Sequence, residues 1–202
     1  MSSSPSAEER SLPAPRWRTT LLAQTGLIAA VYATATFLTM QVMGYLSWGL
    51  VQLRLSEALT VLPLFFPAAV PGLALGCLLG NLLNLGATGP LGWLDVVFGT
   101  TATLLGALWT HRFRTRQGLA LLGPVLSNAL IVPAYLPFVL EAIGITTIPL
   151  TDIPLSGHYA LIYLFGVVCV AAGQAAVVFG IGMPLATVLR RVFEPQQREE
   201  NR

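Results

Sequence analysis

The segment that decides the fold covers positions 53–83 and reads LRLSEALTVLPLFFPAAVPGLALGCLLGNLL. It is apolar almost throughout, and Pro67 and Pro71 interrupt it. Proline lacks a backbone N–H and restricts the residue before it, so PAAVP predicts a tight turn. We expect a short helix near residues 56–66 and a second over residues 71–86. This pair of helices either crosses a membrane twice or forms a re-entrant pair that does not cross.

The composition of the whole chain places this segment in a membrane. Hydrophobic residues make up 54% of the 202 residues, and the mean hydropathy is +0.71. Charged residues make up only 10%, whereas soluble domains typically carry about 25%. So few charges cannot cover a water-soluble globule, and we therefore expect an all-α integral membrane protein.

The charges and the missing motifs exclude several classes of function. A net charge of +2, with arginines in short clusters, gives no broad basic face for nucleic acid. The chain contains no Lys, which excludes a P-loop and Schiff-base chemistry. HExxH, GxSxG, CxxC and aspartate-rich motifs are absent, so we predict no catalytic site, no metal site and no cofactor. Cys77 and Cys169 stand singly in apolar runs, where we expect buried small hydrophobic residues.

Three arginine clusters orient the chain, at residues 16–18, 112–116 and 190–191. Arginine gathers on the cytoplasmic flanks of membrane helices, so the number of crossings between clusters is even. At about 20 residues per crossing, four crossings fit before the middle cluster and two after it. The sequence therefore predicts a six-transmembrane-helix bundle with both termini cytoplasmic. It divides into a disordered tail (1–18), the transmembrane domain (19–192) and a second tail (193–202).

The six helices are expected near residues 20–43, 56–66, 71–86, 92–111, 119–141 and 157–191. The last is longer than one straight crossing needs, so we expect a bend in GIGMP, residues 180–184. In this topology the acidic residues between the tails all lie toward the outer side; they are Glu57, Asp95, Glu141 and Asp152.

Ionisable side chains inside membrane segments are costly and usually functional. Arg54 and Glu57 stand three positions apart, on one face if the second helix has begun. They are candidates for ligand binding or for an interfacial ion pair. Asp95 opens the fourth helix, where it contacts a ligand or is simply favoured by the helix dipole.

Amide and aromatic side chains add further candidates. Asn81, Asn128 and Gln174 lie within predicted helices, where they bind a ligand or form interhelical hydrogen bonds. Trp93, like Trp48, falls at the predicted outer rim. There it is part of an interfacial aromatic belt or a wall on which a planar ligand stacks.

Small residues mark one face of the first helix. Ala29 and Ala33 are four positions apart, with Ala30 and Thr34 beside them. Faces of small residues let membrane helices approach closely. Ala29 and Ala33 therefore contact a partner protein or pack inside this bundle.

The 53–83 segment, joined to LGWLDVVFGTTATLLGA at residues 91–107, resembles the QueT family. The similarity extends to SNALIVP (127–133) and to the glycine-rich part of the last helix, about residues 20–190 in all. The resemblance implies a multi-pass substrate-binding (S) component of an energy-coupling factor transporter in the cell membrane. Its substrate would be a queuosine precursor, a deazaguanine base held near the outer face. It also implies separate partner ATPases and a transmembrane T component that contacts small residues of the first helix.

The matching motifs imply binding roles for individual residues, namely Arg54, Glu57, Asn81, Asp95 and Asn128. Relatives typically carry Gly-Glu where this chain carries Gly173 and Gln174; an amide both donates and accepts hydrogen bonds. An S component for another vitamin-like molecule therefore stays an alternative. A membrane scaffold without a ligand is a second alternative, but it has no need for polar residues around one cavity.

Overall fold

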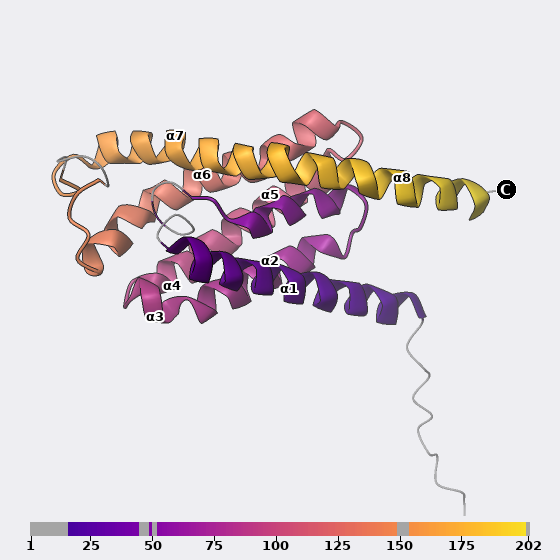
Figure 1. The fold of residues 1–202 in the computed structure, drawn as a ribbon, viewed down its shortest axis with the longest axis horizontal. Coiled ribbons are helices and arrows are strands. Elements are labelled where there is room, and N and C mark those ends of the chain that lie inside the picture. Colours follow the sequence, from indigo (N-terminus) through magenta and orange to yellow (C-terminus); the bar gives the residue numbers. More distant parts are fainter. Residues whose placement is uncertain (1–15, 45–48, 50–51, 149–153, 201–202) are drawn as a thin grey trace, which may run out of the picture.

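The computed structural model describes residues 16–44, 49, 52–148 and 154–200, and these fold almost entirely into helices (Figure 1). In chain order the elements are α1 (Arg16–Met43), η2 (Leu55–Leu64), α2 (Ala69–Leu83), α3 (Leu85–Thr88), α4 (Gly92–Leu94), η3 (Asp95–Gly99), α5 (Thr100–Arg112), α6 (Gln117–Ala142), α7 (Tyr159–Val177), η4 (Val178–Gly182) and α8 (Met183–Glu200). Over these residues there is no strand, and one isolated bridge pairs Thr147 with Pro154.

The protein is an α-helical membrane protein, as the composition predicts. Three helices are long and apolar enough to span a membrane: Trp17–Met43, Gln117–Ala142 and Tyr159–Phe193. Two shorter apolar helices, Leu55–Leu64 and Ala69–Leu83, occupy the segment that decides the fold. The helix of α8 continues to Glu200, so the predicted C-terminal tail begins as helix. The predicted N-terminal tail falls mainly on residues 1–15, which, like Trp48 and Asp152, lie outside the described residues.

The two short apolar helices are η2 and α2, which follow one another in the chain. η2 is a 3₁₀ helix that includes Pro63, and its rise of about 2 Å per residue lets ten residues cover about 20 Å. A turn then leads into α2, at the position that PAAVP predicts. The Nδ1 atom of His111 lies 3.0 Å from the carbonyl oxygen of Pro63. The end of η2 therefore lies beside the middle arginine cluster.

Glycines let α2 pack directly on α1. Gly72, Gly76 and Gly80 are spaced four apart, on one face of α2. A Cβ atom at Gly76 would lie 2.7 Å from the Cβ of Tyr32, and one at Gly80 would lie 2.9 Å from the Cγ2 of Thr36. No larger residue fits at these contacts without displacing α1. This is the close approach that small residues permit between membrane helices.

The close contact with α2 decides which way the alanines of α1 face. Ala29 and Ala33 are buried, and a Cβ atom at Gly76 would lie 2.8 Å from the carbonyl oxygen of Ala29. The expected face open to a partner is therefore occupied by α2. Ala30 and Thr34, beside them, are exposed and line a groove on the outer surface of α1.

Two π-helical turns interrupt the long helices. η3 joins α4 to α5 without a break, and it carries Asp95 at its start. η4 joins α7 to α8 and overlaps the GIGMP segment in which the sequence predicts a bend. Gly182, at the end of η4, packs against η2: a Cβ atom there would lie 3.0 Å from the carbonyl oxygen of Ala58. The last helix is thereby brought close to the segment that carries Glu57.

Candidate functional site

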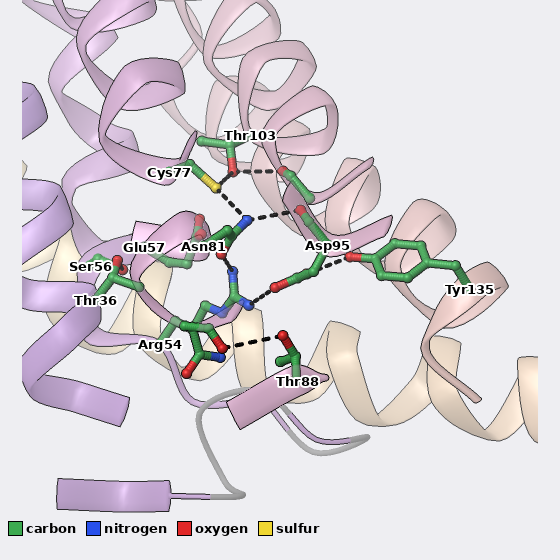
Figure 2. A network of polar contacts seen from close by, with 12 residues as sticks. Thr36, Arg54, Ser56, Glu57, Cys77, Asn81, Thr88, Asp95, Thr103 and Tyr135 are labelled. Atoms are coloured by element: carbon green, nitrogen blue, oxygen red, sulfur yellow. Dashed lines mark hydrogen bonds and ion pairs between the residues drawn. The ribbon is translucent and has the colours of Figure 1, made fainter. Parts of the chain in front are cut away.

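A buried ion pair joins the segment before η2 to η3 (Figure 2). Nη2 of Arg54 donates to Oδ2 of Asp95 over 3.0 Å, and both side chains are about 8% exposed. Nη1 of Arg54 donates to Oδ1 of Asn81 over 3.3 Å. Asn81 in turn donates from Nδ2 to the backbone carbonyl of Asp95 over 2.9 Å. The side chain of Asn81 thus connects the guanidinium of Arg54 with the backbone of Asp95.

The second oxygen of Asp95 is also occupied. The hydroxyl of Tyr135, on α6, donates to Oδ1 of Asp95 over 2.6 Å (Figure 2). The ring of Tyr135 stacks on Phe98 with the centroids 5.7 Å apart. Gly99 packs against the same carboxylate, because a Cβ atom there would lie 2.9 Å from Oδ1. Asp95 is therefore held by a cation, a phenol and close packing; we call Arg54, Asn81, Asp95 and Tyr135 the Asp95 cluster.

Glu57 lies in a different environment. Its Oε1 accepts a hydrogen bond from the hydroxyl of Tyr32, on α1. Its Oε2 accepts one from Nε2 of Gln174, on α7, over 2.9 Å. Glu57 is 2% exposed, and both of these donors are electrically neutral. We call Tyr32, Glu57 and Gln174 the Glu57 cluster.

Cys77 lies beside the Asp95 cluster (Figure 2). Its sulfur accepts hydrogen bonds from Oγ1 of Thr103 over 3.2 Å and from Nδ2 of Asn81 over 3.5 Å. It packs with Tyr32, Leu73 and Ala107 in an apolar layer. Among the residues that the structure describes, no group of three or more His, Cys, Asp or Glu could hold a metal ion.

The structure gathers five of the seven predicted ligand residues and leaves two apart. Arg54, Asn81 and Asp95 belong to one cluster, and Glu57 and Gln174 to the other. Asn128 is buried, but its Nδ2 donates within its own helix, to the carbonyl of Pro124 over 3.2 Å. Trp93 is 57% exposed and stands at the surface in this conformation.

Two tyrosines that the sequence reasoning did not single out complete the clusters. Tyr32 lies near the middle of α1 and Tyr135 lies seven residues before the end of α6, and both side chains are buried. A buried tyrosine hydroxyl requires a hydrogen-bond partner, and tyrosine otherwise favours the ends of membrane helices. Their positions inside apolar helices, away from the helix ends, are the signal in the sequence that could have found them.

These features define an α-helical membrane protein with charged and amide side chains buried between its helices, a class that includes transporters. A model of the QueT transporter family matches residues 22–191. The match covers most of the chain, and the protein belongs to the QueT transporter family. It is a membrane transporter component, as the resemblance implies. Comparison with curated proteins and with solved structures finds no match.

Proposed function

We propose that the protein is the S component of an energy-coupling factor transporter and captures a deazaguanine base, a queuosine precursor. The observation that carries this proposal is the contrast between the two buried carboxylates. Asp95 is already neutralised by Arg54, whereas the hydrogen bonds to Glu57 come from neutral groups. Glu57 is therefore the carboxylate that has most to gain from a new donor.

The chemistry of a deazaguanine edge fits the Glu57 cluster. Such a base presents a ring N–H and an exocyclic amino group side by side, and a carboxylate accepts from both at once. Gln174, next to Glu57, carries a donor and an acceptor that pair with the remaining groups of the edge. Asn81 and Arg54 supply donors for the carbonyl oxygen. Asn128 and Trp93 reach the base only if the helices rearrange on binding.

The chain would cross the cell membrane six times, with both termini in the cytoplasm. The contact of His111 with Pro63 supports two crossings by residues 56–86, because it puts the end of η2 beside an arginine cluster. Figure 1 also shows α1 beginning and α8 ending at the same end of the bundle. Single-cysteine labelling tests this topology: an outside reagent should reach position 152 but not positions 115 or 196. Labelling of position 69 from outside would favour the re-entrant pair.

A T component would contact the exposed groove on α1 rather than Ala29 and Ala33 directly. The groove is lined by Ala30, Val31, Thr34, Ala35 and Leu38. ATP hydrolysis would take place on separate ATPase subunits. The double variant Ala30→Leu, Thr34→Leu should keep base binding and lose co-purification with the partner. In contrast, Ala29→Leu with Ala33→Leu should lower stability and binding together, because overpacking costs about 1–3 kcal/mol.

A thermal-shift screen of the purified protein tests the substrate directly. A ligand at 100 times its dissociation constant stabilises the folded state by about 2.7 kcal/mol. We expect deazaguanine bases to raise the unfolding temperature, and vitamins to leave it unchanged. A shift with a vitamin alone would support the alternative S component. The absence of any shift, with the protein folded, would favour the scaffold.

A further inference from the structure

Tyr32 links the Glu57 cluster to the helix that carries the exposed groove. Its side chain is fully buried in the middle of α1, and its hydroxyl donates to Oε1 of Glu57. Its Cβ is fixed against α2, where Gly76 permits a close contact. One turn further along α1, the hydroxyl of Thr36 donates to Oγ of Ser56 over 2.8 Å. Hydrogen bonds from two buried side chains thus tie the α1–α2 pair to the start of η2.

The other oxygen of Glu57 ties the same carboxylate to α7. Nε2 of Gln174 donates to Oε2, and Gly173 holds this part of α7 tightly against the segment before η2. A Cβ atom at Gly173 would overlap with the carbonyl oxygen of Gln52. In Figure 1, α1 and α7 run along opposite edges of the bundle. Glu57 therefore bridges two helices on opposite sides through its two oxygens.

The carboxylate of Glu57 and both of its donors are closed to solvent. Glu57 is 2% exposed, Tyr32 is 0% exposed and Gln174 is 5% exposed. An incoming N–H group therefore reaches Glu57 only when side chains around it move, and Tyr32 and Gln174 are the two that contact its oxygens. The amide of Gln174 can rotate and pair with the base, since it both donates and accepts. Displacement of the Tyr32 phenol would free Oε1 for the base.

We propose that Tyr32 is an internal competitor for the base, and that its release from Glu57 signals to α1 that the site is loaded. This inference rests on the proposed function, and it assigns a regulation to the same site. In the empty protein the phenol occupies Oε1 and ties α1 to η2. In the loaded protein the base occupies Oε1, and the α1–α2 pair moves relative to α7. The groove on the outer face of α1 moves with it, so a partner seated there senses occupancy.

Affinity measurements on Tyr32→Phe give the first test. The substitution keeps the ring packed on α2 and removes only the donor. The loss of a bond that only the empty state makes raises the free energy of that state alone, so the base binds more tightly. Titration calorimetry of the full-length protein with 7-aminomethyl-7-deazaguanine should show about ten- to a hundredfold tighter binding, because the lost bond is to a charged group. Tyr163→Phe is the control, because Tyr163 donates to the carbonyl of Leu130 away from both clusters; its affinity should stay within about twofold.

The distance between α1 and α7 gives the second test, in which the variant carries no ligand and the wild type is measured both with and without the base. Spin labels at Val31 and Leu164, both exposed, report this distance in a background in which Cys169 is replaced by Ser. Ligand-free Tyr32→Phe should show the distance distribution that the wild type shows only with the base. Tyr32→Leu lacks the same donor and serves if Tyr32→Phe does not fold.

Unchanged or weaker base binding by Tyr32→Phe would overturn the proposal. So would a ligand-free variant whose distances match those of the ligand-free wild type. If the wild type binds no deazaguanine base, the proposed function fails. The ligand-free distances then still decide whether Tyr32 restrains α1.

Discussion

The two buried carboxylates of this protein lie in the same part of the bundle and are held in opposite ways. Asp95 faces a guanidinium at 3.0 Å and a phenol at 2.6 Å. Glu57 faces a phenol and a primary amide, both neutral. A buried charge without a partner of opposite sign is costly. Asp95 therefore has a partner of opposite charge within the protein, whereas the hydrogen bonds to Glu57 come from neutral groups, and we propose that Glu57 is the carboxylate that pairs with the ligand.

Asp95 and Glu57 are both buried and acidic, so burial and acidity alone do not define a binding residue. The donors around each carboxylate are the basis on which we propose different roles for the two residues. Asp95 joins η3 to the segment before η2 and to α6, and it helps to fix the bundle. Glu57 joins α1 to α7 by hydrogen bonds from two neutral side chains, which in our proposal the base replaces.

Removal of Arg54 should have the largest effect on folding stability. A small effect would contradict the difference that we draw between Asp95 and Glu57. Arg54→Met leaves Asp95 buried without its cation, so we expect a loss of about 3–5 kcal/mol of folding stability. The double variant Arg54→Met, Asp95→Leu should regain much of that loss, because no uncompensated charge remains. Unfolding of the purified proteins in denaturant measures both. A single variant as stable as the wild type would show that the pair contributes nothing to the fold.

Crowding of the Asp95 carboxylate should lower the folding stability by a smaller amount. Gly99→Ala places a methyl group 2.9 Å from Oδ1 of Asp95 and 3.1 Å from Nδ2 of Asn81. We expect a loss of about 1–3 kcal/mol from overpacking. Gly180→Ala is the matched control, since nothing lies within 4 Å of a Cβ atom there; its melting temperature should equal that of the wild type. Equal melting temperatures for both variants would mean that the Asp95 cluster is loosely packed.

Gln174→Glu tests the Glu57 cluster. It puts a second carboxyl group in the place of the amide whose Nε2 lies 2.9 Å from Oε2 of Glu57. Loss of the amide donor should change the ranking of related bases by about ten- to a hundredfold, because hydrogen bonds to charged groups contribute about 1.5–3 kcal/mol. Competition binding with a series of deazaguanines measures the ranking. An identical ranking would place Gln174 outside the site.

Trp93→Ala should have the smallest effect. The indole is exposed and belongs to neither cluster, so base affinity should change by no more than about twofold. Titration with the same base checks this. A loss of tenfold or more would mean that Trp93 swings onto the base, as the stacking hypothesis for this residue requires.

Much of the architecture follows from the sequence. Pro67 and Pro71 locate the turn between η2 and α2, and GIGMP locates the irregular turn in the last helix. Burial of a charged or amide side chain in a membrane is costly, so such residues must have hydrogen-bond partners. This applies to Arg54, Glu57, Asn81 and Asp95. All four have such partners in the structure.

Other features depend on packing that no local pattern specifies. Apolar residues are spread around the whole of α1, so its sequence does not say that Ala29 faces α2, that Ala33 is buried, or that Ala30 and Thr34 face outward. The glycines of α2 decide this, through contacts between helices. The pairing of Tyr32 with Glu57 and of Tyr135 with Asp95 joins residues far apart in the chain. For that reason the sequence predicts both carboxylates as ligand residues, and only the structure shows that their partners differ.

The most direct test of this separation is one titration experiment on two conservative variants, Glu57→Gln and Asp95→Asn, each also followed by thermal unfolding. Glu57→Gln should weaken binding of a deazaguanine base about ten- to a hundredfold, since a hydrogen bond to a charged group contributes about 1.5–3 kcal/mol. Its unfolding temperature should stay near that of the wild type. Asp95→Asn should unfold at a lower temperature, while its folded fraction binds the base with nearly wild-type affinity. The reverse result, with binding lost in Asp95→Asn and kept in Glu57→Gln, would contradict the account.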